Sequence, residues 1–568
     1  MTEAEDTTNS TPYSGISTGS KTSPDMIRFH MVRIFAATNH QLMKHITVFI
    51  TLVAWLSVTA FSQQAAQERV KQQLAELPAF MERGMESWGI PGMAVAVVHQ
   101  GEMVYARGFG MRKSDSNDPV DENTIFGMAS LTKAMTATAL AILVDDGKLH
   151  WNDRVRDHLP WFELSDPWIS DRVTISDLLS HQVGIGRMTG NRLRFMPGRD
   201  PQTIMGFLKQ QPFEADFRSG YVYSNMMYMV AGLVIEAVSG MSWNDYMTEH
   251  LFQPLGMNSA RTSITQIAEQ DNIAFPHQEI NDEVIVIPKR NFDNVGPAAS
   301  VMASVSDMAK WMMLNLDTPG VYKGQEIVSL EQIKAIFQPR QRIPLEDPFT
   351  EKITSYGYGW GLRYYEGYRI AQHSGATDGM TSLLVLVPEK DLGIVITSNL
   401  FCNFRPAVRN YILDVLLGTG TDKDWHDHYF HQYEKDKKEA LEKRAEIESK
   451  RVHGTTPTLP LTVYTGKYLH PVYDNAEIRM DENGNLTMQL WDDEEMIANL
   501  EHWHYDTFRA HWRNRSMREK FINFDMDQFG EVKQLNVNFT LRQILISVGI
   551  YPADYYRVVE YSKVNSKQ

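Results

Sequence analysis

The sequence predicts a discontinuous α/β domain with an inserted helical region, followed by a small all-β domain. Apolar runs typical of strands occur near both ends of residues 63–422 and enclose a stretch of helices and loops. Beyond residue 460, short alternating runs separated by turns such as Glu482-Asn-Gly-Asn485 are typical of a barrel or sandwich. The 568 residues, 43% of them hydrophobic, are sufficient for two such cores.

The N-terminus predicts export. Residues 1–42 are polar, and we expect them to be disordered or to reflect an over-extended start before Met43. Residues 43–62 contain a basic start, an apolar run and a small-x-small end, which is the pattern of a bacterial export signal. The apolar run has about 15 residues where a membrane span needs about 20. We therefore expect a periplasmic or secreted protein with no stable membrane span after cleavage, and an uncleaved anchor is the alternative.

The elements of the first domain follow from periodicity and from turn residues. We expect an amphipathic helix at 69–88, a β-hairpin at 93–98 and 103–109, and a helix at 130–144. A mostly helical middle follows at about 150–345. Three strands are expected at 369–372, 382–387 and 392–397, and a final helix at 406–417.

A charged helical linker is expected at 423–459, before the β-domain at 460–568. Lys and Glu alternate from Glu434 to Glu446 as on a solvent-exposed helix. Three nearby histidines, at 426, 428 and 431, suggest a metal site, but a solvated charged segment is the preferred interpretation because the spacing of a known site is missing.

The composition argues against several classes of partner and site. A net charge of -15 argues against nucleic acid as a partner, because phosphate binding needs clustered Lys and Arg. The single cysteine, Cys402, excludes an intramolecular disulfide and a cysteine-based zinc cluster. It follows an apolar strand-like run, so we expect it to be buried. The oligomeric state stays open.

Ser130-Leu-Thr-Lys133 is the most informative motif. Residues three apart lie on one face of a helix, so Lys133 would direct its amine at the Ser130 hydroxyl. A serine becomes a nucleophile when a neighbouring base takes its proton, and Ser–Lys is a known variant of that arrangement. The alternative is a helix N-terminus with Ser130 as the cap and Lys133 in solvent.

Two further motifs can complete such a site. Tyr223-Ser-Asn225 offers a phenol for proton transfer and an amide for substrate or for the Lys133 amine. His373-Ser-Gly375 follows a predicted strand, where Gly375 would let a substrate approach closely and His373 would bind its polar groups. A core tyrosine and a hydrogen-bonded strand-end histidine are the alternatives.

In this order the three motifs resemble the penicillin-recognising serine hydrolases, specifically the class C β-lactamase-like branch. Supporting phrases occur at 90–97, 178–184, 254–257, 299–310 and 356–361, and the resemblance covers about 70–420. It implies a β-lactamase/transpeptidase-like antiparallel sheet flanked by helices with a helical subdomain. The β-domain resembles a small barrel-like domain appended to such hydrolases.

The resemblance also implies roles. Ser130 would be the acylated nucleophile, Lys133 its proton relay and Tyr223 the general base. Asn225, His373 and Gly375 would contact substrate, and the backbone N–H groups of Ser130 and Ala376 would form the oxyanion hole. No metal or organic cofactor is implied.

One departure from the family pattern concerns the substrate. His373 stands where efficient β-lactamases of this branch have lysine, and histidine is largely neutral at pH 7. We therefore expect an exported serine hydrolase acting on a small-molecule or peptide substrate at an ester or amide bond, with esterase, D-aminopeptidase and D,D-peptidase activities left open. A weak β-lactamase and a non-catalytic protein that binds peptidoglycan or a partner are the alternatives.

Overall fold

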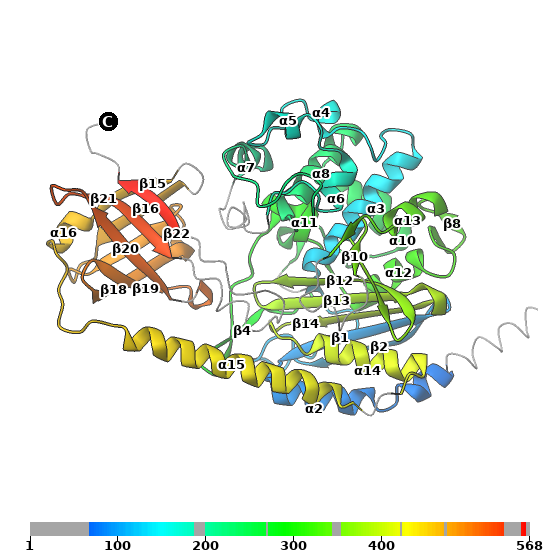
Figure 1. Cartoon of the computed structure of the whole chain (residues 1–568). Helices are drawn as coiled ribbons and strands as arrows, with labels where there is room; N and C mark the ends of the chain where they lie inside the picture. The colour runs from blue at the N-terminus through cyan, green and yellow to red at the C-terminus, as the bar shows by residue number, and fades with distance from the viewer. Residues whose placement is uncertain are drawn as a thin grey trace, which may run out of the picture. The chain divides into compact units, whose positions relative to one another are not determined.

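The computed structural model describes residues 68–186, 199–268, 271–343, 354–420, 423–470, 474–517, 519–538 and 558–563. The predictions for residues 1–42 and for the signal at 43–62 lie outside these residues. The predicted fold class is confirmed: an antiparallel sheet with helices on both faces precedes a closed β-barrel (Figure 1).

An eight-stranded antiparallel sheet organises the first domain, with strand order β2-β1-β14-β13-β12-β11-β10-β9. β1 from the start of the domain pairs with β14 from its end, with Val95 opposite Ile396. This pairing makes the domain discontinuous in sequence. The strands are β1 (Gly92–His99), β2 (Glu102–Gly110), β9 (Gln341–Arg342), β10 (Ser355–Tyr356), β11 (Gly361–Tyr365), β12 (Tyr368–Thr377), β13 (Met380–Val387) and β14 (Leu392–Ser398).

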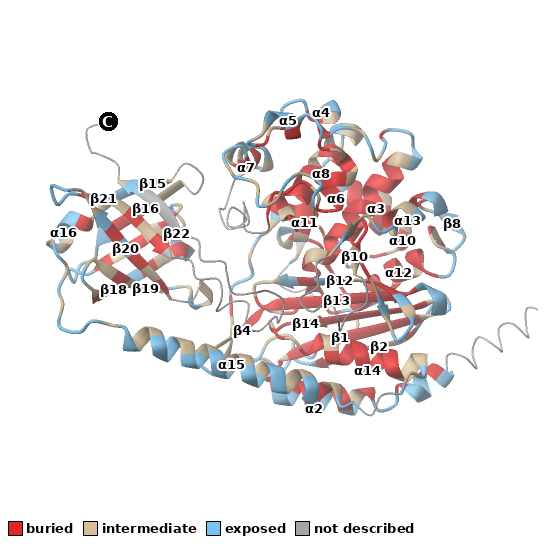
Figure 2. Ribbon diagram, in the orientation of Figure 1, coloured by how far each residue is buried: buried red, intermediate tan, exposed pale blue. Residues whose placement is uncertain are grey.

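The two faces of the sheet belong to different cores, because side chains alternate along a strand. Ala94 and Ala96 of β1 pack with the helical region, whereas Val95 and Val97 pack with the helices on the opposite face. Figure 2 shows the central strands buried throughout, as expected for a sheet covered on both sides. The helices of the second face are α2 (Leu77–Trp88), α14 (Arg405–Leu417) and α15 (Trp425–Ser449).

The helix expected at 69–88 is interrupted at residues 74–76, and α2 begins at Leu77. Pro78 lies in the first turn of α2, where a missing N–H costs no hydrogen bond. The expected end is confirmed, since Gly89 adopts a left-handed conformation and donates its N–H to carbonyls of the last turn.

The helical region contains α3 and α8, and the predicted residues Ser130, Lys133, Tyr223 and Asn225 are at or just before the N-terminal ends of these two helices. Its helices are α3 (Thr132–Asp145), α4 (Val155–His158), α5 (Pro167–Ser170), α6 (Ile175–Leu179), α7 (Pro201–Leu208), α8 (Asn225–Ser239), α9 (Trp243–Met247), α10 (Gln253–Leu255), α11 (Gly296–Ala299), α12 (Val305–Asn315) and α13 (Leu330–Ile336). Three short strand pairs accompany them: β3 (Phe126–Gly127) with β6 (Met302–Ala303), β4 (His277–Ile280) with β5 (Glu283–Val286), and β7 (Val321–Tyr322) with β8 (Gln325–Glu326).

Among the described residues, no single helix has both the length and the apolar character needed to cross a membrane. The segments Asn225–Ser239 and Trp243–Leu255 meet that test only as a pair, with a bend of 83° between them. Most residues of α8 are buried in the core of the helical region.

α15 is longer than the charge pattern indicates, and the expectation of a fully solvated segment is wrong for its first half. Its aromatic residues pack against the core between the sheet and the helices α2 and α14. Trp88 of α2 contacts Phe430 and Tyr433 at ring-centroid distances of 5.5 and 4.8 Å. Tyr433 also donates a hydrogen bond to Glu279. This packing was not predicted from the sequence. The aromatic residues recur at helical spacing, but they stand among many charged residues, and the charges dominated the prediction.

The C-terminal domain is a closed barrel of eight strands in sequential order. Inward-facing positions alternate with outward-facing ones, and Figure 2 shows the alternation as rows of buried residues along β16, β18 and β20. The strands are β15 (Gly466–His470), β16 (Asp474–Met480), β17 (Leu486–Leu490), β18 (Ile497–His504), β19 (Thr507–Trp512), β20 (Lys520–Met526), β21 (Val532–Asn538) and β22 (Val558–Lys563), and α16 (Leu461–Tyr464) precedes them.

Candidate active site

Ser130 and Lys133 lie where a 3₁₀ turn (Ala129–Leu131) continues into α3. Lys133 is fully buried, while Ser130 is partly accessible. The Lys133 Nζ lies 3.0 Å from the Ser130 Oγ. The alternative interpretation, with Lys133 in solvent, is therefore wrong. Ala129 has a left-handed φ of 50°, an uncommon conformation for a residue with a side chain, immediately before Ser130.

Three acceptors surround the Lys133 amine. They are the Ser130 Oγ at 3.0 Å, the Asn225 Oδ1 at 2.7 Å and the Ala298 carbonyl oxygen at 2.8 Å. A lysine ammonium has three hydrogens to donate, which is enough for one hydrogen bond to each of these acceptors. Because Ser130 accepts from Lys133, its own hydrogen is available to another partner.

That partner is Tyr223, whose hydroxyl lies 2.9 Å from the Ser130 Oγ. The Lys133 Nζ also lies 4.9 Å from the centre of the Tyr223 ring, within range of a cation–π contact. Asn225 is the first residue of α8, so Tyr223 is on the loop that leads into this helix. The structure thus brings together four of the predicted site residues: Ser130, Lys133, Tyr223 and Asn225.

The Ala298 carbonyl comes from α11, which packs on α3 and α8. Thr136 of α3 donates to the neighbouring Pro297 carbonyl at 2.8 Å. In α8, Gly232 makes room for the Pro297 ring, because a Cβ at this glycine would lie 2.1 Å from a ring carbon. Sequence reasoning missed this acceptor, since a backbone carbonyl leaves no residue-type signal.

The prediction that the strand ends before His373 is wrong. β12 pairs with β11 as far as Gln372, but its pairing with β13 continues to Thr377. The small and polar residues of this stretch do not have a strand composition, and the pairing with β13 holds them extended. From His373 onward the other edge of β12 faces the turn that carries Ser130.

Gly375 makes this approach possible. A Cβ at Gly375 would lie 2.3 Å from the Met128 carbonyl oxygen and 3.0 Å from the Ala129 Cβ. Ser382 of β13 donates a hydrogen bond to the same Met128 carbonyl at 2.7 Å. The chain before Ser130 therefore lies directly against β12, and Ala376 is the next residue of that strand edge.

His373 is buried, and the structure places it against a tyrosine. Its Nδ1 lies 2.8 Å from the Ser374 carbonyl oxygen, and its Nε2 lies 2.9 Å from the Tyr356 hydroxyl. A carbonyl only accepts, so Nδ1 carries a hydrogen, and Nε2 of a neutral ring can accept from Tyr356. Burial raises the pKa of Tyr356 well above its usual value, which keeps this phenol a donor.

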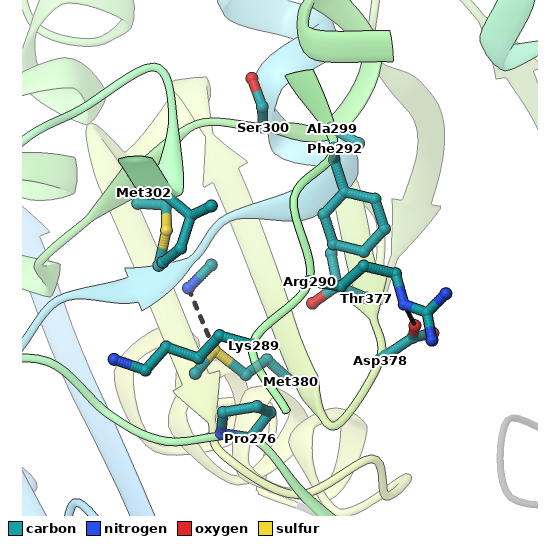
Figure 3. Close-up of a pocket in the computed structure, with 12 residues that line it drawn as sticks. Pro276, Lys289, Arg290, Phe292, Ala299, Ser300, Met302, Thr377, Asp378 and Met380 are labelled. Atoms are coloured by element: carbon teal, nitrogen blue, oxygen red, sulfur yellow. Dashed lines mark hydrogen bonds and ion pairs between the residues drawn. The ribbon is translucent and has the colours of Figure 1, made fainter. Parts of the chain in front are cut away.

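A pocket is lined by residues that are close in sequence to Ser130 and Ala376 (Figure 3). Its lining includes Gly127, three residues before Ser130, and Thr377, the residue after Ala376. Its remaining lining is apolar except for Ser300 and a charged side: Lys289, Arg290 and Asp378, with an Arg290–Asp378 ion pair of 2.8 Å. The apolar lining residues are Ile264, Pro276, Phe292, Ala299, Met302 and Met380.

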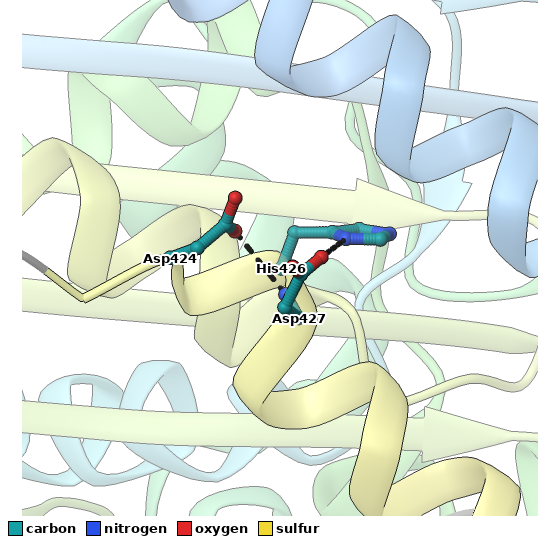
Figure 4. A group of neighbouring side chains, drawn as sticks. All are labelled: Asp424, His426 and Asp427. Atoms are coloured by element: carbon teal, nitrogen blue, oxygen red, sulfur yellow. Dashed lines mark hydrogen bonds and ion pairs between the residues drawn. The ribbon is translucent and has the colours of Figure 1, made fainter.

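The N-terminal end of α15 brings three potential ligands together, Asp424, His426 and Asp427, but they make other contacts (Figure 4). Asp424 caps α15 by accepting from the Asp427 N–H, and both of its oxygens bind the Arg83 guanidinium. The His426 Nδ1 lies 2.8 Å from an Asp427 oxygen. These contacts explain the position of the carboxylates without a metal ion, because Asp424 caps the helix and pairs with Arg83, and Asp427 contacts His426. His428 and His431 are not part of the group.

The fold and the Ser130–Lys133–Tyr223 cluster define a class: a serine hydrolase in which one serine is hydrogen-bonded to a lysine and to a tyrosine. Residues 77–418 match the model of the family described as Beta-lactamase, and residues 450–546 match a domain of unknown function, DUF3471. The first match covers more than half of the chain. The chain therefore belongs to the β-lactamase family.

Among its relatives, the unguisins hydrolase ungD' of Aspergillus campestris is 31% identical over 430 residues, which are 71% of this chain and 77% of that protein. The octameric penicillin-binding protein homologue from Pyrococcus abyssi has a similar structure, with a TM-score of 0.56 and 21% identity over 85% of this chain and 99% of that one. SurE with D-Leu has a TM-score of 0.50 and 19% identity, covering 82% and 98%. The family match and the hydrolase relative support a serine hydrolase, and the two solved structures show the shared fold.

Proposed function

We propose that this chain hydrolyses ester or amide bonds through an acyl-enzyme on Ser130. The observation that carries the proposal is the Ser130 Oγ, which lies 2.9 Å from the Tyr223 hydroxyl and 3.0 Å from the Lys133 amine. Tyr223, as the phenolate, takes the Ser130 proton as Oγ attacks the carbonyl carbon, and the phenol so formed gives that proton to the leaving group as the acyl bond to it breaks. The phenolate left behind then takes a proton from water, the water oxygen attacks the acyl carbon, and Tyr223 returns the proton to the Ser130 Oγ as the ester bond breaks.

The oxyanion hole belongs to the same proposal. The N–H groups of Ser130 and Ala376 stabilise the negative oxygen that forms during attack. The close packing at Gly375, which sets β12 against the turn before Ser130, supports this assignment.

We propose an acyl group with an apolar side chain and no requirement for a carboxylate near His373. The pocket beside Gly127 and Thr377 is lined mainly by apolar side chains, which favour such a group. The contacts of His373 with Ser374 and Tyr356 suit a neutral ring, which offers no permanent charge to the carboxylate of a penicillin. D-configured acyl groups are a natural choice for the test, because a protein of this fold has been solved with D-Leu.

A panel of substrates tests the reaction. p-Nitrophenyl acetate and a longer p-nitrophenyl ester, a D-amino-acid amide, a D-Ala-D-Ala peptide and nitrocefin are compared on the native chain and on Ser130→Ala. We expect a burst of nitrophenol with the native chain, absent in Ser130→Ala, and faster turnover of the longer ester than of nitrocefin. A native chain that hydrolyses nothing on the panel would favour the binding protein, and preference for nitrocefin would favour the β-lactamase.

We also propose export to the periplasm or the medium, on the basis of the pattern at 43–62. The intact mass of the protein recovered from its natural source tests this. A mature N-terminus near residue 63 is expected, and a retained residue 1 would contradict it.

A further inference from the structure

Tyr223 lies on a loop, and loops do not hold a side chain in place unless other contacts fix them. The segment before it runs antiparallel to the loop after α6. The Glu214 N–H donates to the Gly184 carbonyl at 2.9 Å, and the Arg218 N–H donates to the Gln182 carbonyl at 2.8 Å. These backbone contacts lead toward His181, at the end nearest Tyr223.

His181 receives the peptide N–H groups on both sides of Tyr223. The Val222 N–H donates to the His181 carbonyl at 2.9 Å, and the Ser224 N–H donates to the His181 Nδ1 at 3.1 Å. The His181 ring lies against the Tyr223 ring with 4.4 Å between centroids. One buried residue thus binds the backbone N–H groups of both neighbours of Tyr223 and packs its ring against the Tyr223 ring.

The backbone of His181 is unusual in a way that suits this role. Its φ is 60°, in the left-handed region that residues with side chains seldom adopt. Its Nδ1 accepts from a backbone N–H, so the ring hydrogen of a neutral His181 is on Nε2. A histidine that served only to fill the core would need neither the left-handed backbone nor an acceptor at Nδ1.

We infer that His181 is a positioning residue that holds the Tyr223 hydroxyl within reach of Ser130. This inference rests on the proposed function, in which Tyr223 transfers the proton. General-base transfer depends steeply on distance, so a loosened Tyr223 slows both acylation and deacylation while substrate binding changes little. The hydrogen bond that Nδ1 accepts from Ser224 is what holds Tyr223 in place, and ring packing alone is not sufficient.

Two substitutions separate the acceptor from the ring. His181→Phe keeps an aromatic ring but removes the acceptor. His181→Asn places its Oδ1 where Nδ1 was and tolerates a left-handed backbone. Both full-length variants are assayed at a temperature at which circular dichroism shows them folded, with p-nitrophenyl acetate for kcat and KM. Hydrogen exchange of the Ser224 amide is measured in parallel by mass spectrometry.

In His181→Phe we expect kcat to fall about 10- to 100-fold with KM within about 2-fold, and Ser224 exchange to accelerate about 10-fold or more. His181→Asn should recover most of both. Native kcat and slow Ser224 exchange in His181→Phe would overturn the inference, and so would equal losses in the two variants. If the native chain has no turnover, the proposed function fails, while the exchange measurement still decides whether His181 holds the loop.

Discussion

The interior around α3 and the interior of the barrel differ in what they bury. Beside α3, the Lys133 amine is fully buried and hydrogen-bonded to Ser130, Asn225 and Ala298. The barrel interior is mostly apolar, with residues such as Ile522 and Leu535 fully buried on adjacent strands. Burying a charge is costly unless it is paired, so the hydrolase domain retains a group that stability alone would not select.

This difference indicates where activity and stability reside. A substitution beside α3 should change chemistry more than folding, and one inside the barrel should do the reverse.

Lys133→Met should have the largest effect on turnover. Methionine is similar in volume and removes the amine that orients Ser130, so we expect kcat to fall about 1,000-fold. Steady-state hydrolysis of p-nitrophenyl acetate measures the loss of activity, and thermal melting measures the change in stability. A melting temperature that falls sharply while turnover persists would contradict the account.

Tyr223→Phe should lower kcat about 100-fold or more, because it removes the proton acceptor 2.9 Å from Ser130. Tyr221→Phe is the matched control, two residues away on the same loop and equally half-buried. We expect the control to stay within about 3-fold of the native rate. Full turnover in Tyr223→Phe would remove Tyr223 from the mechanism.

Much of this site could be predicted from sequence because its side chains carry the chemistry. The Ser130–Lys133 spacing predicts a shared helix face, and Tyr223 and Asn225 follow from a compact motif. The contributions of Ala298 and His181 could not be predicted, because they act through a backbone carbonyl and through contacts between separate loops. The phrase at 178–184 was the available signal for His181, but it carries no information on its partner.

The fold shows the same limit. Periodicity predicted the hairpin, the central strands and the helix at 406–417, since these have strong apolar patterns. It ended β12 too early, because the residues from His373 to Thr377 are held extended by β13 and not by their own composition. The packed half of α15 was hidden by its charges.

Ile522→Ala tests the barrel side of the contrast. Ile522 is fully buried on β20, so its truncation should lower the free energy of unfolding by about 2–5 kcal/mol. We expect turnover within about 2-fold of native. Denaturant unfolding followed by tryptophan fluorescence measures the loss, and a large drop in kcat of the folded variant would show that the barrel takes part in catalysis.

The smallest effect concerns Glu501 of β18. Burial alone would raise the pKa of Glu501, but hydrogen bonds from His511 and Arg509 and the charges of Arg509 and Arg451 outweigh it and lower the pKa to about 2. Such a carboxylate stabilises the fold above its unfolded pKa near 4.5, and this contribution is lost as the pH falls toward 2. The effect is modest because Glu501 is partly solvated.

Glu501→Gln should therefore flatten the decline in barrel stability between pH 4.5 and 2. Unfolding monitored at several pH values in that window, with turnover at neutral pH as the control, makes the comparison. An identical decline in native and variant chains would show that Glu501 does not carry it.

The most direct test of the central claim is to trap the acyl-enzyme. The native chain is incubated with a fluorophosphonate or a slowly hydrolysed ester, and the digested protein is mapped by mass spectrometry. The account predicts one added group, on the peptide that contains Ser130, with none in Ser130→Ala. Labelling at another residue, or equal labelling of Ser130→Ala, would contradict it.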